Sequence, residues 1–111
     1  MEVAPEASNR LIIGFLRKVF GRDAYIQDGL VSLHRSNFVQ DPAFQRAYRR
    51  GVQSTGGHDP YKWHWRVHVA LWASATASHL DGDFVECGVN YGFMSSAIME
   101  NLDWDRLGKT F

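Results

Sequence analysis

The sequence predicts an α/β fold in which helices come before the first strand of a sheet. Three observations support this: a short apolar run followed by a glycine turn and a helical pattern near residues 83–102, helical spacing of apolar residues at three earlier places, and a breaker-rich linker at residues 54–60. We therefore divide the chain into a helical N-terminal extension, residues 1–60, and the start of a sheet-forming domain, residues 61–111.

The composition restricts the classes of protein that the chain can belong to. An apolar content of 45% with 14% aromatic residues is typical of a globular domain. Twelve basic and twelve acidic residues leave no net charge, so we expect no nucleic-acid partner. The longest weakly charged run, Val67 to Leu80, is too short to form an integral membrane segment. A single cysteine and a Met1–Ser8 stretch unlike a signal peptide predict a cytoplasmic protein.

The first predicted helix begins at a Ser8 or Asn9 cap and runs to Phe20, where Gly21 ends it. Its apolar residues are Leu11, Ile12, Phe15, Leu16, Val19 and Phe20. Its basic residues on the polar side are Arg10, Arg17 and Lys18. Such a helix can pack on its own protein, which we favour, or it can dock on a membrane surface or a partner.

Turn and cap residues define the next two elements. Asp28-Gly29 predicts a bend that leads into a short extended piece ending near His34. Asp41 and Pro42 are typical of a helix cap and first turn, and the helix continues from Ala43 to about Gln53. Its apolar side carries Phe44, Ala47 and Tyr48. Its basic side, which we interpret as a solvated face, carries Arg46, Arg49 and Arg50.

After the Ser54–Pro60 linker, a long helix is predicted from about Tyr61 to Leu80. The stripe expected to lie against a sheet consists of Val67, Leu71, Ser74 and Ala75. His64 and His68 have a spacing that can hold one metal ion, but no third ligand is identifiable, so we assign no metal site. The tryptophans expected to pack in the core or over a ligand cleft are Trp63, Trp65 and Trp72.

The most informative segment is an apolar strand predicted at Phe84–Cys87, followed by a turn from Gly88 to Gly92 and a helix from Phe93 to about Leu102. Its spacing, Glu-x-Gly-x-x-x-Gly, differs from both the dinucleotide fingerprint and the phosphate-binding P-loop. From spacing alone, the two glycines fit a simple strand-to-helix turn equally well. We interpret Cys87 as a small buried residue of the strand rather than a nucleophile.

The identities of the residues in this segment give more information than their spacing alone. Gly82–Val89, the helix rich in Trp and Ala before it, and Ser95–Met99 after it resemble class I S-adenosylmethionine-dependent methyltransferases, with the macrocin O-methyltransferase-like group most similar. The resemblance extends from about Tyr61 to Phe111 and implies a Rossmann-like domain with S-adenosylmethionine as cofactor. In such a domain Glu86 would order the cofactor's methionine end. The cofactor-binding residues implied in this way are Glu86, Cys87, Gly88, Val89, Asn90 and Gly92.

The same resemblance implies that the chain is the N-terminal portion of an enzyme. Lys109–Phe111 would begin the second strand, and the acceptor pocket and catalytic residues would follow it, so no catalytic residue is named here. The implied function is methyl transfer from S-adenosylmethionine to a small-molecule acceptor, as an O-methylation. Two alternatives stay open: a non-catalytic, truncated methyltransferase-like module, and a helical peripheral-membrane or scaffold protein. Association into a homo-oligomer is also left open.

Overall fold

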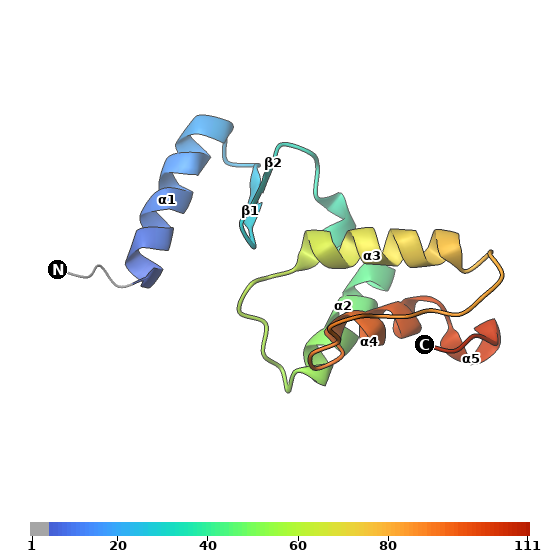
Figure 1. Cartoon of the computed structure of the whole chain (residues 1–111). Helices are drawn as coiled ribbons and strands as arrows, with labels where there is room; N and C mark the ends of the chain where they lie inside the picture. The colour runs from blue at the N-terminus through green and yellow to red at the C-terminus, as the bar shows by residue number, and fades with distance from the viewer. Residues whose placement is uncertain (1–4) are drawn as a thin grey trace. The chain divides into compact units, whose positions relative to one another are not determined.

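The computed structural model describes residues 5–111 as a mixed α/β chain with one two-stranded sheet (Figure 1). Its elements in chain order are α1 Pro5–Phe20, β1 Tyr25–Gln27, β2 Leu30–Ser32, the 3-10 helix η1 Asn37–Gln40, α2 Pro42–Ser54, α3 His64–Ala77, α4 Phe93–Asn101 and α5 Trp104–Leu107. The predicted α/β class is confirmed at this level. The chain divides into two compact units, Met1–Ser36 and Asn37–Phe111, each of which is described by itself.

The first unit contains α1, which ends where it was predicted to end. Gly21 follows the helix with a φ of 93°, and its N–H donates to the Arg17 carbonyl oxygen at 3.1 Å. The helix begins at Pro5 and therefore earlier than the predicted cap at Ser8 or Asn9. None of the helices that the structure describes is long and apolar enough to cross a membrane. The N-terminal stretch examined for a signal peptide lies partly outside the described residues, since residues 1–4 are not described.

A β-hairpin follows α1 in the first unit. Strands β1 and β2 pair antiparallel, with Ile26 opposite Val31. Asp28 and Gly29 connect them with φ values of 53° and 69°, the left-handed pair that a two-residue hairpin turn requires. The predicted bend and extended piece are thus confirmed. The partner strand β1 was not predicted, because both strands have three residues, too few to show a strand periodicity, and the Asp28-Gly29 signal was used only for the segment after it.

The second unit is organised around α2, whose start agrees with the prediction. The Asp41 carboxylate accepts a hydrogen bond from the Phe44 N–H at 2.9 Å, and Pro42 occupies the first turn, where its missing N–H costs nothing. The three arginines predicted to form a solvated face, Arg46, Arg49 and Arg50, are all exposed. The opposite side of the helix is buried.

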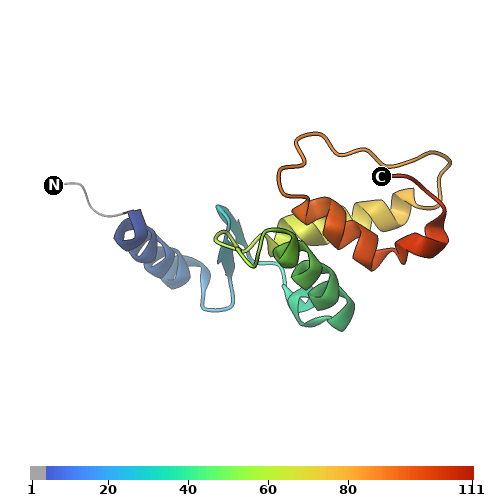
Figure 2. The same ribbon diagram turned by 90° about the horizontal axis from the view of Figure 1, so that it is seen from below.

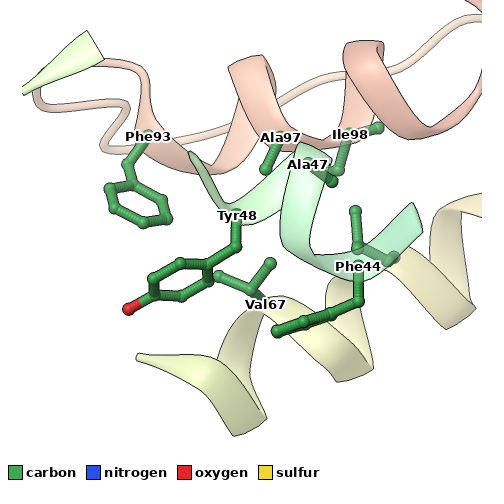
Figure 3. Packing of buried hydrophobic residues seen from close by; sticks show 8 residues of the cluster. Phe44, Ala47, Tyr48, Val67, Phe93, Ala97 and Ile98 are labelled. Carbon is green, nitrogen blue, oxygen red and sulfur yellow. The ribbon is translucent and has the colours of Figure 1, made fainter. Parts of the chain in front are cut away.

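The core of this unit lies between α2, α3 and α4. Figure 3 shows Phe44 and Tyr48 of α2 near Val67 of α3, with Phe93 and Ala97 of α4 completing the cluster. Buried side chains of the size of Val67 or Phe44 stabilise a fold by about 1.5–3 kcal/mol each. Since α2 packs mainly on α4, the segment before the linker belongs to the same compact unit as the segment after it. The units therefore divide at residue 36, away from the boundary predicted at residue 60.

The predicted strand Phe84–Cys87 is not formed, and this prediction was wrong. The connection between α3 and α4 doubles back along α3 without regular structure (Figure 2). It has one strand-like backbone contact, in which the Phe84 N–H donates to the Thr110 carbonyl oxygen at 2.9 Å. A strand needs a neighbour that supplies repeated backbone partners, and the described residues supply one such bond here. A Rossmann-like sheet therefore stays a prediction.

An aromatic cluster joins this connection to the C-terminal residues. Phe84 lies with its ring centroid 5.6 Å from Trp104 and 5.9 Å from Phe111. The Asp83 carboxylate accepts from the Thr110 N–H at 2.8 Å. The Lys109 ammonium donates to the carbonyl oxygens of Leu80 and Gly82 at 2.6 and 2.7 Å. These contacts place the segment before Glu86 beside residues 109–111. They therefore hold the beginning of the loop that leads from Glu86 to α4.

Candidate functional site

A pocket of about 560 Å³ lies in the second unit, where the linker after α2, the start of α3 and the loop before α4 meet. Its volume is in the range of small-molecule sites, about 300–1,000 Å³. The lining residues are Thr55, His58, Pro60, Tyr61, Trp63, Arg66, Glu86, Gly88, Val89, Asn90, Tyr91, Phe93 and Met94. The lining thus combines aromatic rings, one carboxylate, one guanidinium and a glycine loop.

The loop before α4 owes its shape to three residues with left-handed backbone conformation. Gly88, Asn90 and Gly92 have φ values of 76°, 51° and 75°. Glycine adopts this region freely, and asparagine tolerates it better than most residues do. Gly92 is the N-cap of α4, and no side chain caps the N–H groups of the first turn. The turn predicted from the two glycines is therefore present, although no strand precedes it.

Glu86 lies at the start of this loop with its side chain partly buried. Its Oε2 atom is buried and has no hydrogen-bond partner among the described residues. A buried carboxylate oxygen without a donor is costly, about 1–3 kcal/mol or more. The atom therefore fits a ligand that supplies N–H donors, and an ammonium group suits it because it also carries the opposite charge.

Aromatic rings form another part of the lining. Tyr61 and Trp63 stack with ring centroids 5.6 Å apart and an interplanar angle of 17°, and Trp63 meets Phe93 edge to face at 5.2 Å. Aromatic faces of this kind can cover a flat heterocycle or a cation. Trp63 agrees with its predicted place in the core or over a cleft, because it does both. The same prediction was wrong for Trp72, which is 68% exposed.

The linker that supplies these rings is held by the largely buried carboxylate of Asp59. Asp59 accepts hydrogen bonds from the Tyr48 hydroxyl at 2.9 and 3.0 Å and from the Lys62 backbone N–H at 3.2 Å. The Lys62 ammonium lies 3.3 Å from the same carboxylate. Thr55 contributes a hydroxyl 2.6 Å from the His58 carbonyl oxygen. The lining between residues 55 and 63 is thereby attached to α2.

His64 and His68, considered above as a metal pair, stack on aromatic rings. His64 stacks on Tyr48 with centroids 4.3 Å apart, and His68 stacks on Phe38 at 3.9 Å. Burial lowers the pKa of the His64 imidazole below 6.5, while the Asp59 carboxylate acts in the opposite direction and raises it. Within residues 5–111, no group of three or more side chains is arranged to hold a metal ion. The i, i+4 spacing of the two histidines serves packing on α2 and η1.

The structure brings together four of the six predicted site residues. Those that line the pocket are Glu86, Gly88, Val89 and Asn90. Gly92 shapes the loop from the helix cap, without lining the pocket. Cys87 is exposed and outside the lining, so its predicted burial was wrong. The physical reason is that the strand expected to bury it is absent.

In the half of the lining that comes before residue 67, sequence reasoning named Trp63 alone. The main members that it missed are Thr55, His58, Tyr61 and Arg66. The available signal was a linker of turn residues followed directly by aromatic and basic residues at Tyr61–Arg66. Such a segment is suited to line a site, because a loop held by a rigid scaffold presents its side chains.

Comparison of the chain with known family models, with curated proteins and with solved structures gave no match. The similarity to methyltransferases therefore depends on the residues quoted above.

Proposed function

We propose that this chain binds S-adenosylmethionine in the pocket between the linker and the loop before α4, and that it serves methyl transfer to a hydroxyl group of a small-molecule acceptor. The observation that carries the proposal is the buried Oε2 of Glu86, which has no hydrogen-bond donor within residues 5–111 and belongs to the pocket lining. The cofactor's α-ammonium would supply that donor and neutralise the carboxylate.

The loop supports the same ligand. At Gly88 an added Cβ would meet no atom within 4 Å, so its backbone is open to an approaching ligand. The stacked rings of Tyr61 and Trp63 offer apolar surface for the adenine or for the sulfonium centre. When bound, the cofactor supplies a methyl group on a positively charged sulfur, which an acceptor oxygen can displace in line. We assign no catalytic base among the described residues.

Titration calorimetry with S-adenosylmethionine tests the binding step. The chain is expected to bind one cofactor, and Glu86→Gln is expected to weaken binding about tenfold or more, because the substitution keeps the shape but removes the charge. Glu100→Gln is the matched control, since Glu100 is exposed on α4 and outside the lining. Equal affinity of the parent and Glu86→Gln would contradict the proposal.

The transfer step is tested separately, in the protein as it is expressed from its gene. Release of S-adenosylhomocysteine in the presence of hydroxylated small molecules is the expected result. Cofactor binding without any such release would favour the alternative of a non-catalytic module. The two measurements therefore separate a methyltransferase from a domain that only binds its cofactor.

The surface of α1 supports a second candidate function, docking on a membrane surface or a partner. Leu11 and Phe15 are 74% and 65% exposed, and Arg10, Arg17 and Lys18 are exposed on the same helix. Apolar side chains with basic residues beside them suit an anionic lipid surface. Co-sedimentation with anionic vesicles tests this candidate, and Leu11→Ser is expected to reduce it. Equal sedimentation of the parent and the variant would argue against α1 as the contact.

A further inference from the structure

The pocket carries one carboxylate and one guanidinium, contributed by segments twenty residues apart. Glu86 comes from the loop before α4, and Arg66 comes from the first turn of α3. The pocket lining contains no lysine and no second acid. The two opposite charges therefore belong to different elements and line the same pocket.

A lining with this charge pattern is complementary to a zwitterion. An α-amino acid group carries an ammonium and a carboxylate on one carbon atom, so a site that binds it well needs an acceptor and a donor of opposite charge. If the ammonium contacts Glu86, the carboxylate beside it requires a cationic donor in the same pocket. An arginine suits this role because it stays charged at all working pH values and can donate two parallel hydrogen bonds.

We propose that Arg66 binds the α-carboxylate of the ligand whose ammonium is held by Glu86. This inference rests on the proposed function, because it assigns a residue to the methionine end of S-adenosylmethionine. It also states a specificity. The site selects ligands that have a complete amino acid group, and it discriminates against those that lack the carboxylate. His58, the other basic residue of the lining, comes from the linker and is left out of this assignment.

The test compares two ligands on two proteins. The parent chain and Arg66→Gln are titrated with S-adenosylmethionine and with its decarboxylated form, which keeps the ammonium and the sulfonium but lacks the carboxylate. Arg66→Gln is expected to weaken binding of S-adenosylmethionine about tenfold or more and to change binding of the decarboxylated form less than about twofold. Arg66→Lys is expected to fall between the parent and Arg66→Gln, because it keeps the charge and loses the fork geometry.

Arg49→Gln serves as the control for a loss of positive charge, because Arg49 is exposed on α2 and outside the lining. It is expected to leave both affinities unchanged. If Arg66→Gln weakens both ligands equally, or neither of them, the assignment of Arg66 is wrong while cofactor binding by the parent stands. If the parent itself binds no S-adenosylmethionine, the proposed function fails and this inference fails with it.

Discussion

The hydroxyl of Tyr48, in the middle of α2, lies 2.9 and 3.0 Å from the two carboxylate oxygens of Asp59 in the linker. The Asp59 side chain is 9% exposed, so this hydrogen bond is largely shielded from water. It connects the helix that forms the core of the second unit with the segment that lines the candidate site. Stability and ligand binding are expected to depend on it together.

We therefore expect Tyr48→Phe to destabilise the second unit by about 1–2 kcal/mol, because a buried carboxylate loses one donor while Lys62 keeps contact with it. Urea unfolding followed by tryptophan fluorescence measures this, since all four tryptophans lie between residues 63 and 104. Tyr91→Phe is the control, because Tyr91 is 72% exposed. Equal midpoints for the two variants would show that the hydrogen bond contributes nothing.

Close packing of α2 on α4 gives a second prediction. A Cβ at Gly51 would lie 2.5 Å from Cε1 of Phe93 and 3.0 Å from its carbonyl oxygen. Gly51→Ala is expected to destabilise the second unit by about 1–3 kcal/mol, because the clash outweighs the gain in helix propensity.

Gly14→Ala is the matched control for this substitution. Gly14 is also helical, and an added Cβ there meets no atom within 4 Å. The tryptophan-monitored midpoint is expected to stay unchanged, while the helical signal of α1 increases slightly by circular dichroism. A stabilised Gly51→Ala variant would mean that α2 and α4 can separate without cost.

His64 makes the stability of the second unit depend on pH. Burial lowers the pKa of the folded imidazole below 6.5, so the unfolded chain binds more protons in the region just below that value. The free energy of unfolding is therefore expected to fall as the pH is lowered from about 7.5 to about 5. It is expected to level off below the folded pKa, where both states are protonated.

Unfolding of the parent and of His64→Phe at several pH values checks this effect. Phenylalanine keeps a ring against Tyr48 but does not titrate, so the variant is expected to show a weaker dependence on pH. His79→Gln, at an exposed position, is expected to retain the dependence of the parent. If His64→Phe and the parent lose stability equally on acidification, other groups cause the loss.

Local signals in the sequence were sufficient for the end of α1, the start of α2 and one turn. Asp41-Pro42 marks the start of α2 and Gly21 the end of α1, because caps act within one helical turn. Asp28-Gly29 marks the hairpin, because the shape of a two-residue turn also depends on the residues within it. The start of α3 was placed three residues too early, since Lys62 adopts a φ of 56° that interrupts the helix.

Features that depend on contacts between distant residues could not be predicted in this way. The segment Phe84–Cys87 has the composition of a strand, but a strand also needs a neighbour, and its one backbone partner among the described residues is Thr110. The loop half of the pocket, with Glu86 and Gly88, was named from the resemblance to methyltransferases, since the spacing alone fits a simple turn equally well. Apart from Trp63, the half from Tyr61 to Arg66 was not named, because only the packing of the second unit brings it beside the loop.

The last prediction concerns the backbone of the loop. Gly88 lines the pocket with a φ of 76°, so Gly88→Val introduces both a strained backbone conformation and a side chain in the path of the ligand. We expect the affinity for S-adenosylmethionine to fall by about a hundredfold or more, since the clash adds to a strain of about 1–2 kcal/mol. Cys87→Ala is expected to change it less than about twofold, because an exposed side chain outside the lining is removed.

Gly108→Val separates strain from contact with the ligand. Gly108 has a similar φ of 68° and open space around it, but it lies outside the lining of the pocket. Its substitution is expected to lower stability without lowering the affinity of the folded protein for the cofactor. Calorimetric titration of Gly88→Val, Cys87→Ala and Gly108→Val measures their affinities for the cofactor. Unfolding curves confirm that each variant is folded. If Gly88→Val binds as tightly as Gly108→Val, the loop does not contact the cofactor, and the site must be placed elsewhere.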